Sequence, residues 1–90
     1  MRERYMKQFD YIIREELGLH ARAAAKLARY AQASSCDIYI QSGLKTVDMK
    51  NVMGLISLKA LKNDMVRVFV NGEQEEEVLE SIKLYMEENL

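Results

Sequence analysis

The feature that most constrains the fold is a hydrophobic pattern that changes its period repeatedly along one short chain. Some stretches alternate apolar and polar residues, as strands do, and others space apolar residues three to four apart, as helices do. The alternating stretches are residues 8–13, 36–40, 45–49 and 66–70, and the helical ones are residues 21–33, 51–58 and the segment opened by Asn71-Gly72. This pattern predicts an α+β protein with the order β-α-β-β-α-β-α. We expect a four-stranded, mostly antiparallel sheet with the helices covering one face.

Individual residues support these assignments. The first helix carries an alanine-rich apolar face, which lets a helix lie close to a sheet; it consists of Ala24, Leu27, Ala28 and Ala31. Asn51 is a good cap for the short second helix. Asn63 lies in the turn Lys62-Asn63-Asp64 and tolerates a positive φ.

Length and composition exclude several classes of protein. Ninety residues are enough for one domain, which we assign to residues 1–90. A net charge of −1 excludes a general nucleic-acid binder. No apolar run approaches the roughly 20 residues of a membrane span, and the N-terminus has no apolar stretch typical of a signal peptide. One Cys and one His cannot form a disulfide or a usual zinc site. We therefore expect a cytoplasmic monomer without metal or cofactor.

The charge is unevenly distributed along the chain. Residues 1–35 carry a net charge of +3 (seven basic, four acidic), residues 36–72 +2 (five and three) and residues 73–90 −6 (one and seven). Several of these glutamates fall in the first turns of the last predicted helix, where the helix dipole favours negative charge. The acidic segment is therefore explained as a solvated helix face.

The start of the first helix departs from this rule. In Gly18-Leu19-His20-Ala21-Arg22 an imidazole and a guanidinium lie near the positive end of the dipole, where a cation costs about 0.3–1 kcal/mol. The free N–H groups of Ala21 and Arg22 form an anion site, and the N–H donors of the Arg22 guanidinium group match the geometry of phosphate oxygens. His20 beside them is a candidate nucleophile toward phosphorus. The alternative is an ordinary capping histidine followed by a solvated arginine.

Two motifs resemble those of the HPr family, the histidine-containing phosphocarriers of the phosphoenolpyruvate-dependent sugar phosphotransferase system. Residues 18–24 are similar to its Gly-Leu-His-Ala-Arg-Pro-Ala signature, and residues 50–58 to its Lys-Ser-Ile-Met-Gly-Val-Met-Ser-Leu segment. The resemblance implies an open-faced β-sandwich. It also implies that enzyme I phosphorylates His20, that Arg22 attends the phosphate, and that the group passes to sugar-specific components.

The same resemblance implies a partner-binding patch beside the histidine. Val52, Met53 and Ile56 match the family's apolar docking residues, and Arg29 could border them and meet acidic partners. The alternative for the three apolar residues is ordinary core contact from a short amphipathic helix. We expect a mixture of the two, with Met53 the best candidate for exposure because methionine adapts to several surfaces.

Three residues depart from the family pattern. Ala23 replaces the signature proline, which frees one more N–H near the anion site. Asn51 stands where many Gram-positive members carry a kinase-regulated serine, so the helix cap is kept and the regulation is lost. Leu17 is apolar where a small polar residue is common, and its side chain cannot hydrogen-bond a phosphate.

Three functions remain open at this stage. The leading one is a phosphocarrier that uses His20, a transfer partner rather than an enzyme with its own turnover. The second is a divergent HPr-like module that docks on partners with little or no phosphate flux. The third is a small hydrolase resembling an acylphosphatase, which would use Arg22 for the anion but has no evident base. A docking protein has no need of both His20 and Arg22, which favours the first.

Overall fold

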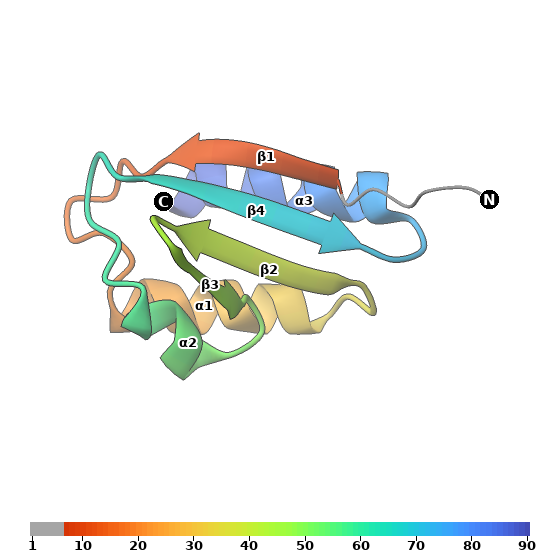
Figure 1. Cartoon of the computed structure of the whole chain (residues 1–90), viewed down its shortest axis with the longest axis horizontal. Helices are drawn as coiled ribbons and strands as arrows, with labels where there is room; N and C mark the ends of the chain where they lie inside the picture. Colours follow the sequence, from red (N-terminus) through yellow and green to blue (C-terminus); the bar gives the residue numbers. More distant parts are fainter. Residues whose placement is uncertain (1–6) are drawn as a thin grey trace.

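The computed structural model describes residues 7–90, which form four strands and three helices (Figure 1). In chain order these are β1 (Lys7–Ile12), α1 (Ala21–Gln32), β2 (Asp37–Ser42), β3 (Lys45–Asp48), α2 (Val52–Ser57), β4 (Met65–Asn71) and α3 (Glu75–Asn89). The predicted element order is confirmed. Figure 1 shows α1 and α3 behind one face of the sheet, with the other face open. In the described part of the chain, no helix is long and apolar enough to cross a membrane.

The sheet has the strand order β1-β4-β2-β3, and all three neighbouring pairs are antiparallel. β4 is central, because it pairs with β1 on one side and β2 on the other. Its alternating valines, Val66, Val68 and Val70, are fully buried beneath the helices. The strict alternation in β4 therefore reflects a strand with one face in the core and the other mostly half-buried.

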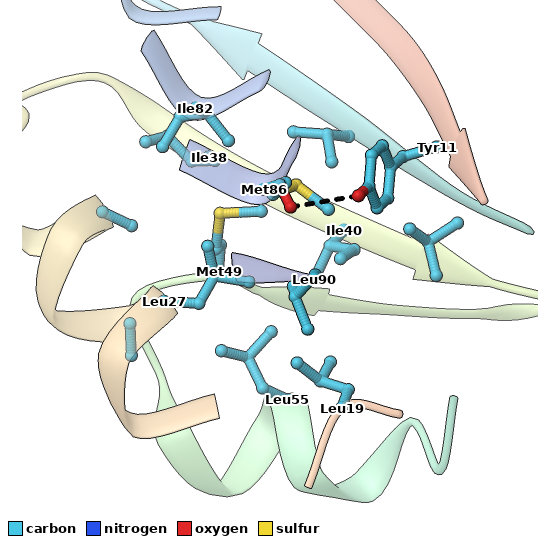
Figure 2. Packing of buried hydrophobic residues seen from close by; sticks show 14 of the residues in the cluster. Tyr11, Leu19, Leu27, Ile38, Ile40, Met49, Leu55, Ile82, Met86 and Leu90 are labelled. Atoms are coloured by element: carbon cyan, nitrogen blue, oxygen red, sulfur yellow. Dashed lines mark hydrogen bonds between the residues drawn. The ribbon is translucent and has the colours of Figure 1, made fainter. Parts of the chain in front are cut away.

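The core lies between the sheet and the helices (Figure 2). The predicted face of α1 is completely buried, and its alanines allow the helix backbone to approach the sheet closely. In Figure 2, side chains from all three helices surround Met49, which follows β3. The buried Tyr11 hydroxyl donates a hydrogen bond to the Met86 carbonyl oxygen at 3.0 Å, which ties β1 to α3. One core thus holds all seven elements together.

The start of the last helix was predicted wrongly. We expected it to follow Asn71-Gly72 directly, but α3 begins at Glu75, after Gly72 at φ 146° and Gln74 at φ 63°. The turn is shaped by Cys36, whose thiol donates to the Glu73 carbonyl oxygen at 3.1 Å. A Cβ atom on Gly72 would lie 3.0 Å from the Cys36 Sγ atom, so the chain passes very close to the thiol before the helix can start.

Candidate functional site

His20 lies immediately before α1, in the N-cap position. Its backbone is extended (φ −80°, ψ 176°), and its carbonyl oxygen accepts the Ala24 N–H at 2.8 Å. The imidazole makes no capping hydrogen bond and is half-buried. The first turn of α1 contains no acidic residue. The helix therefore presents N–H groups without intrahelical partners beside an imidazole that does not cap them.

The loop before His20 is fixed against the segment that follows α2. Gly18 is buried at φ 67°, and a Cβ atom there would lie 2.5 Å from the Ala60 carbonyl oxygen and 2.8 Å from the Leu61 Cα atom. The Leu19 N–H donates to the same Ala60 oxygen at 2.9 Å, and the Leu19 side chain is buried. Only glycine fits this position, and its backbone contact sets where His20 lies.

His20 opens into a shallow depression of about 650 Å³. Arg22 and Lys26 line it from α1, one helical turn apart. Leu17 lines it from the preceding loop and is 68% exposed. Two cationic side chains thus line the same depression as the imidazole, which lies beside the free N–H groups of the helix start; this combination suits a small dianion such as a phosphoryl group.

The depression is closed on another side by carboxylates and by the end of α3. Its remaining lining residues are Glu15, Glu88 and Asn89. The N–H groups of Arg14 and Glu15 donate to the backbone oxygen of Leu90, at 2.6 and 2.7 Å. These bonds bring the last turn of α3 beside the loop that carries His20, although the two are about 70 residues apart in sequence.

The predicted docking residues divide between the surface and the core. Met53 is 71% exposed, whereas Val52 and Ile56 are half-buried and pack against the core cluster. The expected mixture is therefore found, and Met53 is the exposed member. Arg29 is exposed on α1, which packs against α2. Figure 1 shows α2 beside the start of α1, so Met53 is carried at the same end of the molecule as His20.

Sequence reasoning placed His20, Ala21 and Arg22 together but missed other residues of the depression. One of them is Lys26, although its spacing of four from Arg22 places both on one side of the helix. Glu88 and Asn89 gave no local signal, because their position depends on where the end of α3 meets the loop. Among residues 7–90, no three His, Cys, Asp or Glu side chains lie close enough together to hold a metal ion.

The cap of α2 is formed by Asn51. Its side-chain oxygen accepts the Gly54 N–H at 3.0 Å, as its sequence position predicted. This confirms the prediction that Asn51 caps the short second helix.

Comparison with known proteins places the chain in a family. Residues 7–88 match the family described as the PTS HPr component phosphorylation site. The HPr-like protein Crh of Bacillus subtilis is 33% identical over 85 residues, which cover 94% of this chain and 100% of Crh. The phosphocarrier protein HPr of Mycoplasma genitalium is 35% identical over 86 residues, 93% of this chain and 97% of that protein.

Solved structures agree. HPr-C-His from Thermoanaerobacter tengcongensis superposes with a TM-score of 0.87 at 31% identity, covering 93% of this chain and 94% of that one. A Crh structure from Bacillus subtilis, described as a domain-swapped, intertwined dimer, gives a TM-score of 0.71 at 31% identity and covers 100% and 98% of the two chains. Fold, family match and sequence identity agree, and the chain is a divergent member of the HPr phosphocarrier family of the phosphotransferase system.

Proposed function

We propose that this chain accepts a phosphoryl group on His20 from enzyme I and passes it to sugar-specific components of the phosphotransferase system. The observation that carries the proposal is the position of His20: it directly precedes an α1 first turn without acidic residues, in an open depression shared with Arg22 and Lys26. An open site suits a carrier, because the donor and the acceptor must each bring their own reactive group to the imidazole.

The chemistry asked of the chain is positioning and charge neutralisation. A lone pair on the neutral imidazole of His20 attacks phosphorus, so an N–P bond forms while the bond between phosphorus and the donor breaks, and the donor leaves with that electron pair. The backbone N–H groups of Ala21, Arg22 and Ala23 and the Arg22 guanidinium stabilise the phosphoryl oxygens. Transfer to the acceptor is the same exchange in reverse, with His20 as the leaving group.

The fixed loop supports this role. Because Gly18 and Leu19 contact Ala60 through their backbones, the backbone that carries His20 is positioned before any partner arrives. A preorganised nucleophile lowers the entropic cost of reaching the transition state. We expect Met53 and Arg29, with parts of Val52 and Ile56, to form the contact surface for both partners.

The direct test is intact-mass analysis after incubation with phosphoenolpyruvate and enzyme I of the same source. The parent chain gains one phosphoryl group that is lost at acidic pH, as a phosphoramidate is, and the His20→Ala variant gains none. Circular dichroism of both proteins controls for folding. Phosphate on the His20→Ala variant would place the acceptor elsewhere.

A second candidate function is a docking module with little phosphate flux. It is favoured by Leu17, which presents an exposed apolar side chain to the depression, and by the similarity to the HPr-like protein Crh. No phosphorylation of a folded parent chain by a competent enzyme I would select this candidate. Since the related Crh structure is described as a dimer, the monomer expected from the sequence remains a prediction, which light scattering at several concentrations measures.

A further inference from the structure

A second concave surface lies between α1 and α3 and does not include His20. This hollow of about 480 Å³, which we call the seam groove, has Tyr30, Leu84 and Tyr85 as its apolar lining and Glu77, Glu80 and Glu88 as its acidic rim. A further hollow of about 420 Å³ adjoins it toward Cys36 and shares Tyr30, Glu77 and Ser81 with it. The seam groove is therefore part of a longer furrow along the two helices.

The floor of the seam groove is an aromatic pair. The rings of Tyr30 and Tyr85 stack with their centroids 4.3 Å apart and an interplanar angle of 15°. The hydroxyl groups of Tyr30 and Ser81 form a hydrogen bond across the two helices, which holds the Tyr30 ring in place. Leu84 beside them is 52% exposed and Tyr30 is 37% exposed. The floor is thus an ordered apolar surface that remains in contact with water.

The rim carries charge that the fold uses only in part: Glu77 lies in the first turn of α3, where the helix dipole favours a carboxylate. Within residues 7–90 the acidic partners of the ion pairs are Glu76, Glu16 and Asp10, and no ion pair involves Glu77, Glu80 or Glu88. The last turn of α3 contains no basic residue, so Glu88 also opposes the helix dipole there. A local rule broken without structural gain is a common mark of a binding surface.

We propose that the seam groove binds a basic amphipathic helix of a partner protein. The aliphatic parts of lysine or arginine side chains would lie on Leu84 and on the tyrosine rings, which attract cations. The charged ends of the same side chains would reach the glutamates. The groove runs along α3 from Glu77 to Glu88, a length of about 16 Å at a helical rise of ~1.5 Å per residue. This length accommodates about three turns of a bound helix. The carboxylates disfavour nucleic acids and anionic membranes as occupants.

The test uses a fluorescein-labelled amphipathic peptide of four turns with lysines on one face and leucines on the other, and a second peptide in which glutamate replaces every lysine. We expect the full chain to bind the lysine peptide, with NMR amide shifts concentrated at Tyr30, Leu84 and Tyr85. The glutamate peptide should not bind. Failure to bind the lysine peptide, or shifts centred on the open face of the sheet, would overturn the proposal.

Matched charge variants separate the groove from general attraction. The double variant Glu77→Gln/Glu80→Gln should weaken peptide binding about five- to tenfold, as expected from the loss of two ion pairs. The control Asp37→Asn/Glu87→Gln removes the same charge outside the groove and should bind as the parent does. Equal weakening in both variants would refute a specific site. Phosphorylation of His20 should be unchanged in both, so this result is independent of the proposed carrier function.

Discussion

Replacing Gly18 by alanine tests whether the backbone contact behind His20 positions the site. Gly18 and Gly43 have nearly the same positive φ, 67° and 61°, but different surroundings. A Cβ atom at Gly18 would meet the Ala60 carbonyl oxygen at 2.5 Å, whereas at Gly43 nothing lies within 4 Å. Gly43→Ala is therefore a matched control that carries the same conformational penalty without the clash.

The expected magnitudes follow from these contacts. The left-handed conformation costs an alanine about 1–2 kcal/mol at either position. At Gly18 the clash must also displace the Ala60 carbonyl group, which disturbs its hydrogen bond with the Leu19 N–H and adds about 0.5–1.5 kcal/mol. We therefore expect Gly18→Ala to lower the free energy of unfolding by about 2–3 kcal/mol and Gly43→Ala by about half as much.

Urea denaturation followed by circular dichroism measures both variants. With an m-value of about 1 kcal/mol/M, the two midpoints should differ by about 1 M. Because the clash also displaces His20, we expect enzyme I to phosphorylate folded Gly18→Ala more slowly than folded Gly43→Ala. Equal destabilisation of the two variants would refute the steric argument, and a parent-like phosphorylation rate in Gly18→Ala would refute the link from this contact to the site.

Three further predictions concern single positions. Ala23→Pro should keep the fold, because the Ala23 N–H that it removes has no partner within the helix, but it should change the rate of phosphoryl transfer to His20. Identical rates for the two proteins in a stopped-flow assay would show that this N–H has no role in transfer. Asn51→Ser should keep the cap of α2 and gain phosphate from an HPr-directed ATP-dependent kinase, while the parent gains none; phosphate on the parent would contradict the loss of control. A hydrogen bond from Arg67 lowers the pKa of Asp10, so their contribution to stability is present above the ordinary aspartate pKa and is lost as pH falls through the lowered value. Acid titrations of the parent and Asp10→Asn should diverge in this window, less so in high salt, and an NMR titration of Asp10 at its ordinary pKa would contradict the assignment.

The sequence predicted those parts of the fold that depend on nearby residues. Alternation identified the buried valines of β4, and turn chemistry identified Asn63, which has φ 77°. The sequence placed His20 and Arg22 in one candidate site because both lie at a helix start, where the helix dipole disfavours cations. It failed at the start of α3, where the packing of Gly72 against Cys36 decides the boundary. It also missed Glu88, which reaches the depression only through the assembled tertiary structure.

The order of the strands in the sheet has a consequence for how the chain folds during synthesis. β2 and β3 are neighbours in sequence and pair as a hairpin, so they can form early. β1 pairs only with β4, and its Lys7 lies opposite Val70. At a ribosomal rate of about 5–20 residues per second, β1 waits several seconds for its partner, with both edges unpaired and its apolar side chains exposed. Of the four strands in the described residues, the first to be made is thus among the last to be paired, and a chaperone that binds nascent chains would meet it in that interval.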